Sequence, residues 1–333
     1  MNPQMSLRLL CNFWVAALGV CFASWHVEAQ VSRLPAIPLY GREYVRVNDM
    51  ARTFGMSAFV QGRSVTLKSQ YVNLRLEIDS REASLNGTKL WLSLPPTSAR
   101  GMTLISRTDA IKVLDPVLFP PRSTSPAAFR AIVIDPGHGG VDEGARSRTG
   151  LQEKMLALDL SKRLQQLLAQ KGFVVSLTRA RDKTLPLDER VKIAKELRAG
   201  LFVSLHFNSE GRGSSARGIE TYCLTPSGAA STASTRSRTL GPGLPGNRFD
   251  DRNMLLAYSI HRNVLASAKA PDRGVRRARF YVLQYADCPA ILIECGFLSN
   301  RAEATRISTT AYRDQLARGI AEGILDYKRI LER

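Results

Sequence analysis

Short β-branched runs alternate with leucine-rich amphipathic segments between residues 132 and 330, and this alternation restricts the fold more than any other feature of the chain. The predicted strands lie at residues 132–134, 173–177, 201–205, 218–222, 280–283 and 290–293. The predicted helices lie at residues 153–171, 187–199, 253–268 and 312–330. Strands that alternate with helices in this way form parallel sheets with helical connections. The sequence therefore predicts an α/β domain, with a mostly parallel, twisted sheet flanked by helices.

Residues 36–118 have a different pattern, made of short strands and turns. Residues 64–68 alternate apolar and polar side chains, which is typical of a half-buried strand. Asn86-Gly87 separates two further short runs and favours a two-residue hairpin turn. Residues 119–129 are rich in proline and serine, which is a linker composition. We therefore predict a small, strand-rich α+β module over residues 36–118, then the linker, then the α/β domain over residues 130–333.

Residues 1–29 predict export. Arg8 precedes an apolar stretch over residues 9–25, and small residues stand shortly before a cleavage point after Ala29, as in a secretory signal peptide. An uncleaved anchor is the alternative, because the apolar stretch approaches the length needed to span a bilayer. After cleavage no stable membrane span is expected. The protein would then lie in the periplasm, in the cell envelope or outside the cell.

The charge balance indicates an acidic partner. The chain has 47 Lys and Arg residues against 29 Asp and Glu residues, which gives a net charge of +18. Nucleic acid, an anionic lipid surface and an acidic cell-wall polymer would each suit this charge. Export argues against nucleic acid as a partner.

A histidine surrounded by glycines follows the first strand of the α/β domain. Asp135-Pro136 ends the strand, and the glycines at 137, 139 and 140 permit backbone turns that other residues avoid. Such a loop brings an imidazole, here that of His138, close to another group. A tight turn with an exposed histidine is the alternative, so this loop alone does not establish a site.

Four residues that bind metals or move protons are predicted to meet at one edge of the sheet. His206 and Glu294 directly follow their strands, as His138 follows the first strand, and Glu153 opens the first helix. The carboxyl ends of parallel strands lie at the same edge. Catalytic zinc uses three nitrogen or oxygen ligands and one water. Two histidines and one glutamate, with the second glutamate as a proton shuttle, would suit metal-assisted hydrolysis.

Each of these residues also has a purely structural explanation. Glu153 is favoured at a helix N-terminus by the helix dipole. His206 would serve as a hydrogen-bonded core histidine, and Glu294 as a buried ion-pair partner. Their joint position at one sheet edge favours the metal site.

Three further residues are weaker candidates. Asp135 and Asn208 lie close in sequence to the two histidines and are predicted to orient them as secondary groups. Arg276 belongs to a dense basic run over residues 273–279. This run would either hold carboxylates of an acidic substrate or form a solvated face.

A series of ordered motifs runs through the α/β domain. These are Ile134-Asp-Pro-Gly-His-Gly-Gly140, Glu153-Lys154, Thr178-Arg179, Leu187 with Arg190, Phe202-Val-Ser-Leu-His206, Gly218-Ile-Glu-Thr-Tyr222 and Ile293-Glu-Cys-Gly-Phe-Leu-Ser-Asn300. By these motifs the segment resembles the zinc-dependent N-acetylmuramoyl-L-alanine amidases of the type-3 family, which are cell-wall hydrolases. The resemblance implies that His138, Glu153 and His206 bind Zn²⁺ and that Glu294 is the catalytic carboxylate. It also implies a substrate, peptidoglycan, cut between the lactyl group of N-acetylmuramic acid and the first L-alanine of the stem peptide.

The segment over residues 225–252 departs from the pattern of this family. It is rich in Ser, Gly, Pro and Thr and lacks a helical apolar period, so we predict a mobile loop. We expect it to shape or cover the groove without supplying a zinc ligand. Some relatives carry at this place a helix that blocks the zinc until a partner removes it, so a protein activator is among the partners that the resemblance implies.

The N-terminal module resembles a second known domain. Gly41-Arg-Glu-Tyr-Val45, Leu85-Asn-Gly87 and Gly101-Met-Thr-Leu-Ile105 are similar to the stalk-like module named for the N-terminal domain of copper amine oxidase. The sequence of the module has no cluster of metal ligands, so copper is not implied. A binding, spacing or regulatory role is expected.

Two other functions stay open at this point. A catalytically silent or autoinhibited wall-binding regulator would keep the same fold, although it would not need all four site residues. A glycosidase would use Glu153 and Glu294 as its carboxylate pair. That reading leaves His138 and His206 without a role and predicts reducing sugar ends as products.

Overall fold

The computed structural model describes residues 34–120, 130–211, 214–233, 241 and 243–332. The predicted signal peptide and most of the predicted linker lie outside these ranges. Among the helices of the described part of the chain, none has both the length and the apolar character needed to cross a bilayer.

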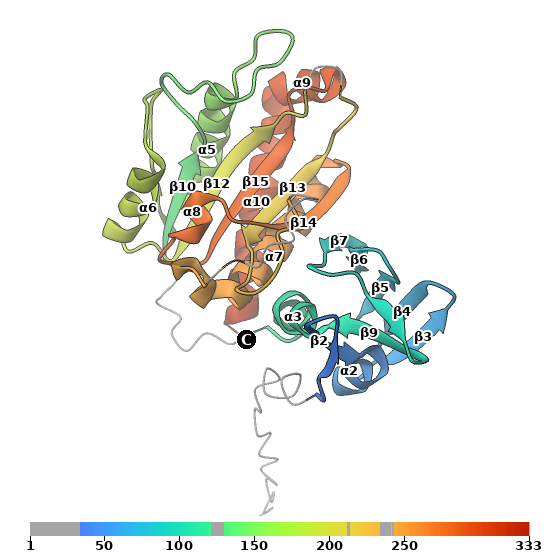
Figure 1. The fold of residues 1–333 in the computed structure, drawn as a ribbon. Helices are drawn as coiled ribbons and strands as arrows, with labels where there is room; N and C mark the ends of the chain where they lie inside the picture. The colour runs from blue at the N-terminus through green and yellow to red at the C-terminus, as the bar shows by residue number, and fades with distance from the viewer. Residues whose placement is uncertain (1–33, 121–129, 212–213, 234–240, 242, 333) are drawn as a thin grey trace, which may run out of the picture.

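One mixed sheet forms the centre of the molecule (Figure 1). Its strands follow the order β11-β10-β12-β15-β13-β14-β7-β6-β5-β4-β3. The strands of the α/β part are β10 (Ala131–Pro136), β11 (Val174–Leu177), β12 (Leu201–Asn208), β13 (Ile219–Leu224), β14 (Asp272–Ala278) and β15 (Ala290–Phe297). All neighbouring pairs among these are parallel except β13 and β15, which are antiparallel. The predicted mostly parallel sheet is confirmed.

Helices cover both faces of this part of the sheet. Their bounds are α5 (Glu153–Gln170), α6 (Leu187–Glu196), α7 (Asp250–Ala268), α8 (Tyr281–Gln284), α9 (Arg301–Ser308) and α10 (Thr310–Leu331). Helices α5, α7 and α10 pack together on one face. Helices α6 and α8 lie on the other face. Side chains alternate along a strand, so Ile132 and Ile134 enter the large core under α5, whereas Val133 enters a smaller core with Ala194 of α6.

One sequence-based expectation about the elements near residue 280 is wrong, and one strand there was not predicted. The short apolar run at residues 280–283, predicted as a strand, is the helix α8. The basic run, for which no strand is predicted, forms most of β14. An apolar run of four residues does not distinguish strand from helix, and the neighbours of β14 that pair with it are distant in sequence.

The N-terminal module contributes the remaining strands. Its own four-stranded sheet has the order β1-β2-β9-β8. The strands of the module are β1 (Ile37–Leu39), β2 (Arg42–Arg46), β3 (Ser57–Gln61), β4 (Ser64–Lys68), β5 (Asn73–Glu77), β6 (Glu82–Leu85), β7 (Thr88–Trp91), β8 (Thr97–Ala99) and β9 (Met102–Ser106). Its helical segments are α2 (Val47–Thr53), α3 (Arg107–Asp109), η1 (Ala110–Leu114) and α4 (Asp115–Leu118). Asn86 and Gly87 both have positive φ, as the predicted hairpin turn between β6 and β7 requires.

The module joins the α/β part through main-chain pairing. Strand β7 lies beside β14 in parallel orientation, with Leu90 opposite Val275. The antiparallel strands β3 to β7 therefore extend the central sheet, and one hydrophobic cluster contains buried residues of both parts. In space the two predicted domains share a sheet, although a proline-rich segment separates them along the chain.

Part of the insertion over residues 225–252 is packed against the rest of the chain. Residues 229–232 are buried, the hydroxyl of Ser231 donates to the carbonyl of Arg277 at 2.8 Å, and Arg279 Nη2 donates to the carbonyl of Ala229 at 2.7 Å. The prediction of a mobile loop is therefore wrong for these residues. The partners are Arg277 on β14 and Arg279 directly after this strand, and composition does not predict these contacts.

Candidate metal and hydrolytic site

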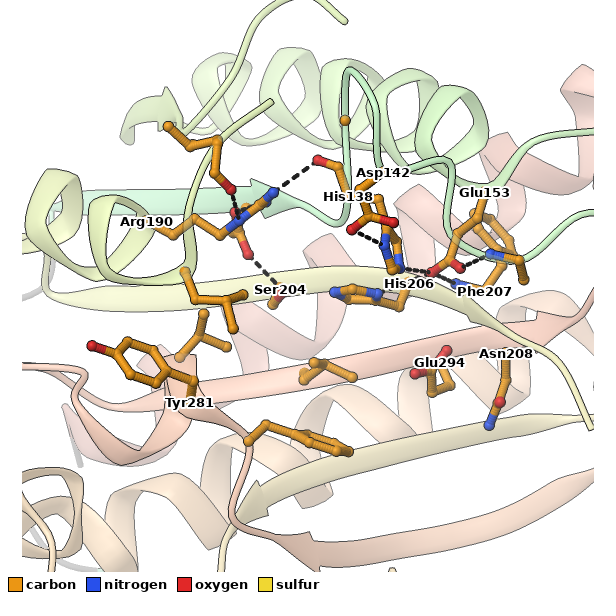
Figure 2. A pocket seen from close by; sticks show the side chains of 18 of the residues that line it. His138, Asp142, Glu153, Arg190, Ser204, His206, Phe207, Asn208, Tyr281 and Glu294 are labelled. Atoms are coloured by element: carbon orange, nitrogen blue, oxygen red, sulfur yellow. Dashed lines mark hydrogen bonds and ion pairs between the residues drawn. The ribbon is translucent and has the colours of Figure 1, made fainter. Parts of the chain in front are cut away.

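Three side chains with metal-binding atoms meet at the carboxyl ends of the parallel strands (Figure 2). His138 lies in the loop after β10, His206 lies on β12, and Glu153 opens α5. One ligand atom from each lies within 4.8 Å of the others. Glu153 Oε1 is 3.0 Å from His138 Nε2 and 2.9 Å from His206 Nδ1. The three donors therefore face a common point.

The loop that carries His138 is fixed by charged groups on both sides. His138 has a φ of +58°, a left-handed conformation that is strained for a residue with a Cβ. Buried Arg190 holds this backbone, since Nη2 donates to the carbonyl of His138 and Nη1 donates to that of Pro136, each at 2.8 Å. Asp142 Oδ2 accepts a hydrogen bond from His138 Nδ1 at 2.8 Å. This bond orients the imidazole and directs its Nε2 at the common point.

Glu153 is held as an ionised carboxylate. Its Oε1 accepts the amide hydrogen of Phe207 at 3.0 Å and its Oε2 accepts that of Ala145 at 2.7 Å. Burial raises the pKa of this carboxyl, but hydrogen bonds and charge from His138 and His206 outweigh burial, so the pKa lies well below its usual range. The side chain is therefore an anionic ligand with a fixed orientation.

Glu294 lies on the wall of the same site and has a different environment. It is the register partner of His206 on β12 and of Glu220 on β13. Its Oε2 is buried, and within the part of the chain that the structure describes it has no hydrogen-bond partner. Burial, together with the charges of Glu153 and Glu220, raises the pKa of Glu294 well above its ordinary value. Such a carboxyl group is suited to accept and return a proton.

The donor set suits a zinc ion. Two imidazole nitrogens and one carboxylate oxygen form the three-ligand set of catalytic zinc, which leaves a fourth position for water or substrate. The buried Oε2 of Glu294, which has no hydrogen-bond partner among the described residues, is the atom that would face a group in that position. Asp142 completes the arrangement as the carboxylate partner of a ligating histidine.

The three donors and Glu294 line a cavity of about 690 Å³. Two apolar walls flank the cavity. Residues 185–187, at the N-terminal end of α6, form one wall, and residues 280–282, at the N-terminal end of α8, form the other. In Figure 2, Tyr281 lies on the side of the cavity opposite Arg190. Exposed Phe280 and Tyr281 offer aromatic surface at the rim. A substrate bound here would pass between these walls to reach the polar centre.

The three weaker candidates differ in their positions relative to the cavity. Asp135 is 1% exposed and accepts hydrogen bonds from Thr178, Ser204 and Arg190, so it holds Arg190 and not an imidazole. Asn208 lines the cavity and donates to Glu220 Oε2 at 3.2 Å. Arg276 does not line the cavity, because it stacks on Trp91 of the module.

Two other side chains with metal-binding atoms are structural. His261 is fully buried between Thr221 and Asp272, at 2.9 Å from each. Cys295 is buried in the large core, on the face of the sheet that α5, α7 and α10 cover, as strand alternation predicts. None of the described residues of the insertion over 225–252 lines the cavity.

Sequence reasoning missed the roles of Asp142, Arg190 and Glu220. Asp142 stands four residues after His138, and Arg190 belongs to a matched motif, so both were visible without an assigned role. Glu220 also belongs to a matched motif, but its role depends on partners on β12, β13 and β14.

Gly137→Ala is expected to displace His206. A Cβ at this position would lie 2.3 Å from His206 Cε1, far inside van der Waals contact. We expect kcat/KM to fall at least about tenfold, because a small displacement of a catalytic group is costly, and we expect the zinc affinity to fall in chelator competition. Gly243→Ala is the matched control, since its Cβ would approach Ser227 Oγ only to 3.7 Å. Normal zinc affinity in Gly137→Ala would contradict the crowding argument.

Several known proteins resemble the α/β part of this chain. The family model described as N-acetylmuramoyl-L-alanine amidase matches residues 132–326. The amidase LytC of Bacillus subtilis is 34% identical over 205 residues, which cover 62% of this chain and 37% of LytC. The amidase AmiA of Salmonella typhimurium is 30% identical over 229 residues, covering 62% of this chain and 79% of AmiA. The crystal structure of an N-acetylmuramoyl-L-alanine amidase from Clostridium difficile 630 aligns with a TM-score of 0.51 at 35% identity, over 60% of this chain and 97% of that one.

Proposed function

The chain belongs to the N-acetylmuramoyl-L-alanine amidase family, and on that premise we propose that it hydrolyses the amide between the lactyl group of N-acetylmuramic acid and L-alanine of the stem peptide in peptidoglycan. One observation carries the proposal. His138, Glu153 and His206 offer three donor atoms within 4.8 Å, and the buried carboxyl of Glu294 lies on the same cavity wall. This combination supports metal-assisted hydrolysis of an amide.

Three of the site residues would bind the metal, and a fourth would transfer protons. His138, Glu153 and His206 would hold Zn²⁺, which when bound supplies a Lewis acid that activates water and polarises the scissile carbonyl. Glu294 takes the proton of the attacking water and returns it to the nitrogen of the leaving L-alanine. Its raised pKa allows the carboxyl to hold that proton between the two transfers. Asp142 and Arg190 keep His138 in its strained conformation throughout.

We further propose that the protein acts in the periplasm or outside the cell. Residues 1–29 would serve as its signal peptide, with the mature chain starting at Gln30. The net charge of +18 suits a peptidoglycan partner, which is an acidic polymer. N-terminal sequencing of the exported protein tests the cleavage point.

The test of the proposed activity uses residues 30–333 on isolated peptidoglycan, with products identified by mass spectrometry. We expect free stem peptides that begin with L-alanine, lost on chelation and restored by zinc. Reducing sugar ends with intact lactyl amides would instead indicate a glycosidase that uses Glu153 and Glu294. Bound zinc without any product would indicate a silent or autoinhibited wall-binding protein that requires an activator.

A further inference from the structure

A row of polar side chains crosses the sheet from the cavity towards the N-terminal module. His206, Glu294 and Glu220 lie opposite one another on β12, β15 and β13. Directly opposite residues of paired strands project to the same face of a sheet. The row therefore begins at the candidate metal site and continues on the face that carries the cavity.

Strand β14 extends this row through a bulge. Ile219 pairs with Asp272 while Thr221 pairs with Val275, so β14 has one extra residue at this place. On a regular strand Arg273 and Arg276 would project to opposite faces. Because of the bulge both reach Glu220 Oε1, with Arg273 Nε at 2.8 Å and Arg276 Nη1 at 3.5 Å.

Trp91, the last residue of β7, contacts both arginines from the module. The guanidinium carbon of Arg276 lies 4.5 Å from the centroid of the Trp91 ring, a cation–π contact. Trp91 Nε1 donates to the carbonyl of Arg273 at 2.9 Å. Gly274, between the arginines, has a φ of +93°, and a Cβ there would lie 2.8 Å from Trp91 Cδ1. The bulge of β14 thus packs directly on the indole.

Glu220 links these arginines to the cavity. The residue is 1% exposed, and its Oε2 accepts hydrogen bonds from Asn208 Nδ2 at 3.2 Å and from the hydroxyl of Tyr222 at 2.8 Å. Asn208 lines the cavity two residues after His206, and Glu294 lies beside Glu220. A carboxylate held by two arginines, an amide and a phenol has a single orientation, so it fixes this wall of the cavity.

We propose that Trp91 is a positioning residue for hydrolysis: through Arg276 and Glu220, the N-terminal module holds Asn208 and Glu294 in their places on the cavity wall. This inference rests on the proposed function. It assigns the module a part in the reaction of its own chain, in addition to any contact with the wall.

The test compares Trp91→Leu and Trp91→Phe in the full-length protein on peptidoglycan. Leucine removes the aromatic face, and we expect kcat to fall about tenfold because the wall that carries Glu294 loosens. We expect KM to stay within about twofold and zinc content to stay at the wild-type level, since the contacts of Trp91 and Arg276 lie at the Glu220 end of the row, away from His206. Phenylalanine keeps a face for Arg276, so Trp91→Phe should recover kcat to within about threefold of wild type.

Tyr258→Phe is the matched control for a general weakening of the contacts between the N-terminal module and the α/β part. It removes the hydrogen bond from the Tyr258 hydroxyl to the carbonyl of Leu85, at 3.1 Å, without touching the row. We expect wild-type kcat for this variant. A lower melting temperature of Trp91→Leu with unchanged kcat, or an equal fall of kcat in Tyr258→Phe, would overturn the proposal.

Arg276→Lys gives an independent answer if Trp91→Leu fails to fold. Lysine keeps a positive charge near Glu220 but loses the flat group that stacks on the indole. The same fall in kcat is expected, and wild-type kcat would overturn the proposal. An inactive wild-type protein would refute the proposed function itself, so the two failures are distinguishable.

Discussion

Replacement of Glu294 by glutamine is expected to lower kcat about a thousandfold, because an amide of the same shape cannot take a proton from water or return it to the leaving nitrogen. The zinc content should stay at the wild-type level, since the three proposed ligands are untouched. Among the described residues Oε2 of Glu294 has no hydrogen-bond partner, so the replacement breaks no contact of this atom with the protein. The measurements are kcat on peptidoglycan and metal content by mass spectrometry.

Two further variants complete this test. Glu294→Asp keeps a carboxyl group but withdraws it from the cavity, so an intermediate kcat is expected. Asp159→Asn is the matched control far from the cavity, because Asp159 pairs with Arg163 and Arg313. Asp159→Asn should change the free energy of unfolding and leave kcat unchanged. A Glu294→Gln variant within tenfold of wild type, a difference of about 1.4 kcal/mol in barrier, would show that another group moves the proton.

His138→Gln is expected to remove both bound zinc and activity. The variant loses one of three donors and leaves Asp142 without its imidazole partner. Loss of the metal removes several kcal/mol of transition-state stabilisation, which corresponds to a fall of about a thousandfold or more in kcat/KM. Zinc content, and activity before and after chelation and zinc addition, are the measurements.

His261→Gln is the matched histidine control for metal loss. His261 also contacts a carboxylate, that of Asp272, but it is fully buried and lies outside the cavity. We expect a lower melting temperature with normal zinc content. Zinc retained in His138→Gln, or lost in His261→Gln, would contradict the proposed ligand set.

Local sequence patterns predicted most of the helices and strands of the α/β part correctly. Leucines spaced along α5 predict its buried face, and Leu156, Leu160, Leu164 and Leu168 are all buried there. The Asn86-Gly87 pair predicts the hairpin, because few other residues adopt the backbone angles of that turn. The meeting of His138, Glu153 and His206 also follows from sequence, since parallel strands place their carboxyl ends at one edge.

The sequence did not predict contacts between segments that lie far apart along the chain. The run at residues 280–283 is helical, and residues 229–232 are buried, because of partners far away in the chain. Arg190 acquires its role only when the loop after β10 meets α6.

The sequence by itself determined the periodicity of the strands and helices and the residue types at the ends of the strands, because both are local properties of the chain. Only the tertiary structure decided that β7 pairs with β14 and that Trp91 lies against Arg276. The pairing edge of a strand and the face to which a bulge directs a side chain depend on which neighbour the strand meets. For that reason the four residues of the site were predictable from the sequence, whereas the link from the N-terminal module to the cavity was not.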